Sequence, residues 1–96
     1  MIMVWGSYCG HCNRAKPAFG KVFDDLKQGK VFLTSLQTDD TDPDVQKLMK
    51  RFPSILKKHG ISFNGVPTYI VYHKGVYREY QGSRDEQALK SFISSL

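Results

Sequence analysis

Two cysteines separated by two residues carry the clearest chemical signal in this sequence. Cys9 and Cys12 are the only two cysteines of the 96 residues, and they frame the segment CGHC. Four residues make about one helical turn, so both sulfurs can come within disulfide distance with little strain. The spacing predicts a redox-active dithiol and excludes a disulfide that ties distant segments together.

The position of the pair predicts different roles for the two thiols. Cys9 lies at the expected start of a helix, where unpaired N–H groups and the helix dipole stabilise an anion. The pKa of a thiol is lowered there, which makes Cys9 the predicted nucleophile. Cys12 lies one turn further along and is expected to resolve the mixed disulfide that Cys9 forms. Gly10 and His11, between them, complete the predicted catalytic segment.

Three other roles for the cysteines are open at this point. A zinc site needs two further ligands, and the sequence offers only His11, His59 and His73, the last two expected far from the pair. An iron–sulfur cluster needs more thiolates than one chain supplies, unless the chain dimerises. The cysteines could also be inert core residues. Their place between a strand and a helix favours the redox role, for which no metal or organic cofactor is expected.

The hydrophobic pattern predicts the elements that position the cysteines. Strands are expected at residues 1–5, 31–36, 68–73 and 76–80, and helices at residues 10–27 and 45–59 and from a capping box at residues 83–86 onward. Gln28 and Gly29 should stop the first helix, Pro53 should kink the second or split it in two, and Lys74 and Gly75 should form a tight hairpin.

The order of these elements indicates the fold class. A strand, a helix and a strand in succession imply a parallel pair with a right-handed crossover, and the hairpin adds an antiparallel part. We therefore expect an α/β fold of order β-α-β-α-β-β-α, with a four-stranded mixed sheet flanked by helices. Residues 1–96 are expected to form a single domain.

Four features, in the same order along the chain, match one known protein family. They are WGSYCGHC at residues 5–12, Pro17, GVPT at residues 65–68 and YQGSR at residues 80–84. They resemble the active-site segment, helix proline, cis-proline loop and last strand of the thioredoxin superfamily, and CGHC is similar to its protein disulfide isomerase branch. The resemblance implies a thioredoxin-like fold and an enzyme that oxidises, reduces or isomerises protein disulfides.

The resemblance also implies a substrate groove opposite the cysteines. Pro67 would follow a cis bond and pack near the sulfurs, leaving the Val66 backbone free to pair with an extended substrate peptide. Tyr8 would form an apolar shoulder beside Cys9, and Gly82 would leave room in the groove. From the residues alone, the alternative for Pro67 is an ordinary turn proline before a strand.

Arg84 and His11 are the residues expected to adjust the thiol chemistry. Arg84 resembles the arginine that swings toward the active site and helps to ionise the resolving cysteine, although a surface arginine near a helix start is an equal alternative. An imidazole at His11 can stabilise the Cys9 thiolate, which raises the reduction potential. We expect a potential nearer to about −180 mV, as in disulfide isomerase, than to about −270 mV, as in thioredoxin.

Several features depart from the family pattern. The family has a buried Asp or Glu six residues before the first cysteine, where this sequence has Met3. We therefore expect Cys12 to ionise more slowly, or to depend on Arg84 and water. Asn13 replaces a usual lysine, and Tyr8 replaces a usual tryptophan. The longer segment around Pro53 could add a helical turn or a substrate-facing lip.

Two rival functions follow from the same sequence. The chain starts with the active-site strand, as glutaredoxins do, so a glutathione-dependent oxidoreductase is an alternative. Against it, CGHC differs from the usual glutaredoxin CPYC, and no clear glutathione-binding signature follows the cis-proline. The other rival is a thioredoxin-fold binding module that holds a partner around Tyr8, Val66 and Pro67 without turnover.

Charge and composition limit the partners. The net charge is +5, with an acidic cluster over residues 39–44 and a basic one over residues 47–58. Such clusters are typical of solvated faces, and no aromatic platform for nucleic acid accompanies them. No apolar run approaches the roughly 20 residues of a membrane span, and no signal peptide is evident.

These features set our expectations for partners and compartment. We expect a monomer that acts on protein thiols and disulfides and exchanges electrons with glutathione or a reductase. No partnership with nucleic acid or membrane is expected. The cytoplasm is the favoured compartment, with the ER lumen or another oxidising compartment as the alternative.

Overall fold

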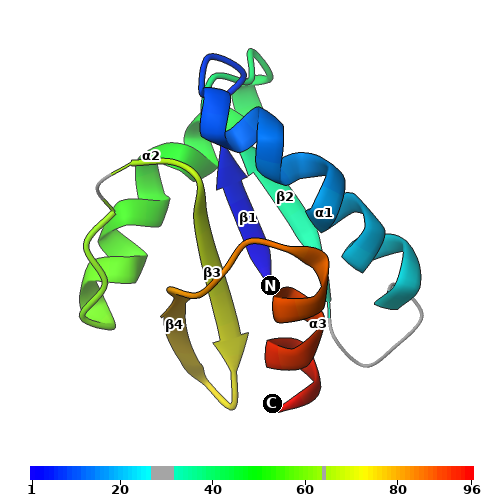
Figure 1. The fold of residues 1–96 in the computed structure, drawn as a ribbon. Helices are drawn as coiled ribbons and strands as arrows, with labels where there is room; N and C mark the ends of the chain where they lie inside the picture. Colours follow the sequence, from blue (N-terminus) through cyan, green and yellow to red (C-terminus); the bar gives the residue numbers. More distant parts are fainter. Residues whose placement is uncertain (27–31, 64) are drawn as a thin grey trace.

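The computed structural model describes residues 1–26, 32–63 and 65–96, which form a mixed sheet flanked by helices (Figure 1). The elements in chain order are β1 (Ile2–Trp5), α1 (Gly10–Leu26), β2 (Thr34–Gln37), α2 (Pro43–Lys58), β3 (Thr68–His73), β4 (Val76–Tyr80) and α3 (Glu86–Ser94). The predicted order of strands and helices is confirmed. No helix of the described residues is long and apolar enough to cross a membrane.

The sheet has the strand order β2-β1-β3-β4. β1 and β2 are parallel and joined through α1, whereas β3 is antiparallel to both β1 and β4. Lys74 and Gly75 connect β3 to β4 with φ angles of 51° and 78°, as a tight hairpin requires. Because β1 and β2 run in the same direction, the loops that follow them lie at the same edge of the sheet (Figure 1).

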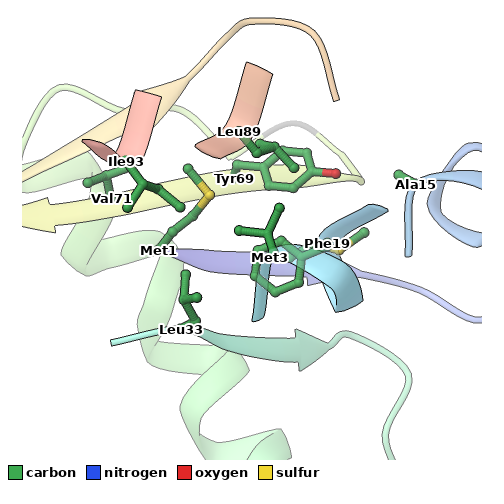
Figure 2. Close-up of a cluster of buried hydrophobic side chains, with 10 residues drawn as sticks. Met1, Met3, Ala15, Phe19, Leu33, Tyr69, Val71, Leu89 and Ile93 are labelled. Carbon is green, nitrogen blue, oxygen red and sulfur yellow. The ribbon is translucent and has the colours of Figure 1, made fainter. Parts of the chain in front are cut away.

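The two faces of the sheet carry separate parts of the core. Successive residues of a strand point to opposite faces, so Met3 and Tyr69 belong to one face and Val4 and Ile70 to the other. The first face packs against α1 and α3 (Figure 2); the buried residues of this cluster are Met1, Met3, Ala15, Phe19, Val22, Leu33, Tyr69, Val71, Leu89 and Ile93. The second face packs against Phe52 and Leu56 of α2 and against Ile61. The prediction of helices on both faces is confirmed.

β2 starts later than the pattern of β-forming residues predicts. The prediction covers residues 31–36, but the strand spans Thr34–Gln37, and Val31 lies outside the described residues. Pairing with β1 sets these limits, since Ile2 lies opposite Thr34 and Trp5 opposite Gln37. Phe32, predicted in the strand, is 78% exposed.

α1 starts at Gly10 as predicted, and its predicted end at Lys27 and stop at Gln28 and Gly29 lie outside the described residues.

α2 is continuous, so of the two effects predicted for Pro53, a kink or a split, the split does not occur. The helix spans Pro43–Lys58 and includes Pro53. A proline inside a helix removes one backbone hydrogen bond, but Phe52 and Leu56 pack into the same cluster on either side of it. This shared burial stabilises one helix. The start is two residues earlier than predicted because Asp42 caps the helix and Pro43 occupies its first position.

α3 begins later than the predicted capping box places it. The cap is Asp85, whose carboxylate accepts a hydrogen bond from the backbone N of Ala88 at 2.8 Å. Ser83, the predicted cap, instead donates its hydroxyl hydrogen to the Asp85 carboxylate. Arg84 therefore lies in the loop before α3 and not in the helix.

Candidate active site

Cys9 lies immediately before α1 and caps that helix with its sulfur. Its carbonyl accepts a hydrogen bond from the backbone N of Asn13 at 3.1 Å, which is the first turn of the helix. Its Sγ accepts another from the backbone N of Cys12, also at 3.1 Å. A side chain that accepts an N–H of the first turn satisfies a donor the helix leaves unpaired.

This environment lowers the pKa of the Cys9 thiol. The largest cause is a hydrogen bond from the Cys12 thiol, and the backbone N–H groups of Cys12 and His11 and the positive charge of Arg84 act in the same direction. Partial burial opposes them. A lowered pKa enlarges the thiolate fraction at neutral pH, and the thiolate is the reactive form.

Cys12 lies in the opposite environment. It is fully buried, and this burial is the largest cause that raises the pKa of its thiol. Its hydrogen bond to Cys9 raises the pKa further, whereas Arg84 lowers it. Both cysteines are free thiols in this structure.

The loop before β3 lies against the Cys9 sulfur. The Cys9 thiol donates a hydrogen bond to the carbonyl oxygen of Val66 at 3.6 Å, and the Val66–Pro67 peptide bond is cis. Pro67, Gly82 and Arg84 border a common hollow of about 270 Å³. The structure thus brings these predicted site residues to the same end of the sheet as the cysteines.

Tyr8 and Gly82 also make contacts that the sequence did not indicate. The Tyr8 ring lies over Gly6, where an added Cβ would be 2.5 Å from the ring, and its hydroxyl is 3.5 Å from Oγ1 of Thr38. The Tyr8 side chain is exposed, and its hydroxyl is directed toward the loop after β2. The space beside Gly82 is occupied by the Tyr80 ring, because a Cβ there would lie 2.5 Å from the Tyr80 hydroxyl.

His11 is exposed, and its imidazole contacts Arg14. Nη2 of Arg14 lies 2.9 Å from Nδ1 of His11. A guanidinium can only donate, so Nδ1 is the acceptor in this contact. The contribution of His11 to the acidity of Cys9 comes from its backbone N–H.

Asp39 anchors the active-site loop, a role the sequence analysis missed. Its carboxylate accepts hydrogen bonds from the backbone N of Ser7 at 3.0 Å and from the Ser7 hydroxyl. These bonds lower the pKa of Asp39 to about 2. The Asn13 side chain holds the same loop by donating to the Ser7 carbonyl at 3.2 Å. The sequence could have indicated this contact through the positions of the two residues, since Ser7 and Asp39 each follow one strand of a parallel pair.

The histidines considered as zinc ligands lie elsewhere. His59 follows α2 and packs against Tyr77 with ring centroids 4.9 Å apart. His73 ends β3, six residues from the loop that contacts Cys9. Across residues 1–26, 32–63 and 65–96, no three His, Cys, Asp or Glu side chains form a group that could hold a metal ion.

Comparison with known proteins decides the family. The thioredoxin family model matches residues 1–95. The chain belongs to the thioredoxin family. Among its relatives are protein disulfide isomerase-like 2-2 of rice, 26% identical over 98 residues, and the thiol-disulfide oxidoreductase ResA of Bacillus thuringiensis, 26% identical over 103 residues. These alignments cover 99% and 96% of this thioredoxin-family chain, but the chain spans only 23% of the rice protein and 60% of ResA.

Solved structures confirm the thioredoxin-like fold. The J-Trx1 fragment of ERdj5 superposes with a TM-score of 0.71 at 15% identity, covering 98% of this chain and 40% of that fragment. Human ERp44 superposes with the same TM-score at 21% identity, covering 98% of this chain and 26% of ERp44.

Proposed function

We propose that this chain is an enzyme that exchanges thiols and disulfides with protein substrates through Cys9 and Cys12. One observation carries the proposal: the Cys9 sulfur caps α1 with a lowered pKa, beside a buried second thiol that donates to it. The family membership and the relatives' names support it.

The reaction begins with Cys9. Its thiolate attacks one sulfur of a substrate disulfide, forming a bond between Cys9 and the substrate and breaking the substrate's own bond. The electron pair of the broken bond leaves on the other substrate sulfur, which takes a proton from solvent. The exposed side of Cys9 admits the substrate, and the α1 N-terminus stabilises the attacking anion.

Cys12 completes the cycle. Its thiolate attacks Sγ of Cys9, which forms the Cys9–Cys12 disulfide and releases the second substrate sulfur as a thiol. The two electrons that reduce the substrate come from the Cys9–Cys12 pair. Running the steps backward oxidises a substrate dithiol, and releasing the mixed disulfide to a different substrate thiol isomerises it.

Residues around the sulfurs would hold the substrate. We assign an extended substrate segment to the loop of Val66 and Pro67, where backbone pairing gives affinity without sequence specificity. Tyr8 and Gly82 would border this groove. Arg84 would favour the thiolates of both cysteines, since its charge lowers the pKa of each.

The proposed catalytic unit is the single domain of residues 1–96, acting as a monomer without metal or organic cofactor. Exchange between sulfurs needs neither, because thiols supply both the electrons and the nucleophile. The recycling partner would be glutathione or a protein reductase.

Turnover measurements test the proposal. Wild-type chain should accelerate insulin reduction by dithiothreitol, and Cys9→Ser should not. Activity confined to hydroxyethyl disulfide with glutathione would instead support the glutathione-dependent alternative. Partner capture that persists unchanged in Cys9→Ser, without any turnover by the wild type, would contradict the proposal and support a binding module. The reduction potential of the Cys9–Cys12 pair then indicates the direction of electron flow. A value near about −270 mV indicates a reductase, and a value near about −180 mV indicates an oxidase or isomerase.

A further inference from the structure

Tyr69 carries a buried hydroxyl that the exchange reaction has not yet used. Its side chain is 2% exposed, and its hydroxyl has no hydrogen-bond partner among the described residues. Buried polar groups are nearly always paired, because an unpaired one costs free energy that nothing offsets. The Tyr69 hydroxyl is therefore available to pair with a group that appears in another state of the protein.

The sheet places this hydroxyl on the cysteine side of the core. Tyr69 in β3 lies opposite Met3 in β1, so the two side chains share the face that packs against α1. Its ring packs against Phe19 and Tyr80, with centroids 6.0 and 6.1 Å away. Figure 2 shows the hydroxyl pointing toward Ala15, which lies one helical turn beyond Cys12.

The charged and titratable groups that act on Tyr69 belong to the active site. Burial raises the pKa of Tyr69 to about 12; Cys12 and Tyr80 raise it, and Arg84 opposes them. The hydroxyl is therefore protonated at neutral pH and is available as a donor. A negative charge on Cys12 lies within electrostatic reach of this hydroxyl.

We propose that the Tyr69 hydroxyl donates a hydrogen bond to the Cys12 thiolate while the mixed disulfide is resolved. The inference rests on the proposed function and extends it to a residue that stabilises the second anion. In the dithiol state the Cys12 thiol donates to Cys9, so Cys12 offers no anion to Tyr69. Once Cys9 is bonded to substrate, the buried Cys12 must ionise, and its thiolate needs a donor.

The proton and electron balance leaves Tyr69 unchanged. The Cys12 thiolate attacks Sγ of Cys9, and the pair of electrons of the Cys9–substrate bond leaves with the substrate sulfur. The proton released by Cys12 passes through solvent to that sulfur. Tyr69 keeps its own proton and contributes only the hydrogen bond. Met3 has no carboxylate that could assist Cys12. Tyr69, its neighbour across the strands, supplies a hydrogen-bond donor to the Cys12 thiolate instead.

The aromatic disulfide dithiobis-nitrobenzoate separates the two steps. The reduced chain should release one coloured thiolate when Cys9 attacks and a second when Cys12 resolves the adduct. Tyr69→Phe removes one oxygen and retains the ring. We expect the first release to be unchanged and the second to slow by about tenfold or more, with its pH midpoint about one unit higher.

Tyr72→Phe is the matched control, since it makes the same change on β3 at a side chain that is 59% exposed. It should leave both steps unchanged. An unaltered second step in Tyr69→Phe would overturn this role while the proposed function stands. Slowing of both steps together with a lower unfolding temperature would also overturn it, as structural damage. Release of only one thiolate by the wild type would overturn the proposed function itself.

Discussion

Cys9 and Cys12 are the same side chain at opposite ends of one helical turn, yet their pKa values shift in opposite directions. Cys9 faces the loop of Val66 and accepts backbone hydrogen bonds at the start of α1. Cys12 is turned into the core, where burial disfavours its anion. The backbone around Cys9 stabilises charge, whereas the packing around Cys12 excludes water.

One CxxC segment can therefore contain two thiols whose acidity is set by different parts of the molecule. Cys9 depends on local features, namely the helix start and the loop held by Asp39 and Asn13. Cys12 depends on residues far away in the sequence, because burial in the core raises the pKa of its thiol and Tyr69 of β3 interacts with it electrostatically. Changes to each set should therefore affect one step of the exchange and leave the other unchanged.

The largest expected effect comes from separating the two thiols. Cys12→Ser keeps the nucleophile but removes the resolving group, so it should accumulate mixed disulfides through Cys9 and lose turnover by at least about a thousandfold. Mass spectrometry of the products formed with oxidised insulin measures the adduct. The Cys9→Ser/Cys12→Ser double variant should form none, and adduct formation by that variant would contradict the assignment of Cys9.

A carboxylate at position 3 tests the control of the second thiol. Met3→Glu puts a proton acceptor on the core face shared with Tyr69, so the resolving step should accelerate about tenfold while the attack by Cys9 stays the same. A carboxyl group in place of a buried thioether should lower the free energy of unfolding by about 2–4 kcal/mol. Met3→Gln, with similar size and no acidity, is the control. A faster second step in the Gln variant, measured by two-step thiolate release, would contradict this explanation.

A smaller effect is expected from the contact of Arg14 with His11. Arg14→Ala removes the guanidinium that lies against Nδ1 of His11, so the imidazole is free to turn and donate a hydrogen bond to the Cys9 thiolate. That bond should stabilise the thiolate and raise the reduction potential by about 10–20 mV. Equilibration with glutathione measures the change. The same substitution should have no effect in a His11→Ala background, and an equal shift there would assign the effect to Arg14 alone.

The smallest effect concerns the anchor of the Cys9 loop. Because the folded pKa of Asp39 is about 2, below the ordinary value of about 3.9, its bonds to Ser7 contribute fully above that ordinary value. They are lost as the pH falls through about 2. The Ser7 amide resonance should therefore titrate near pH 2. Asp39→Asn should remove this titration and change the alkylation rate of Cys9 by about twofold, leaving Cys12 unaffected. A Ser7 midpoint near 3.9 in the wild type would contradict the anchor.

Much of the fold could be predicted because the signals are local. The periodicity of apolar residues placed the strands of residues 68–73 and 76–80 correctly, and the Lys74 and Gly75 turn joined them. The errors fall where distant contacts override a local preference. Pro53 lies within an unbroken helix because its neighbours share one cluster, and β2 starts at Thr34 because β1 pairs with it from there.

The candidate site divides in the same way. CGHC and its position before a helix indicated Cys9 and Cys12, and GVPT indicated the loop at Val66 and Pro67. The sequence did not reveal Asp39 or Tyr69. Asp39 resembled one more solvated acid in a charged cluster, and Tyr69 resembled an ordinary strand residue. Their roles depend on strand register, which brings Ser7 within hydrogen-bond reach of Asp39 and sets Tyr69 opposite Met3.

The dithiol and its placement at a helix start follow from the residues alone, because four consecutive residues and the helix that follows them create that environment locally. The surroundings of the second thiol, in contrast, come from the packing of distant segments. Burial of Cys12, the unpaired hydroxyl of Tyr69 and the reach of Arg84 arise from packing β3 and the loop before α3 against α1. This packing depends on many contacts between segments that are far apart in the sequence, so no local sequence pattern specifies it.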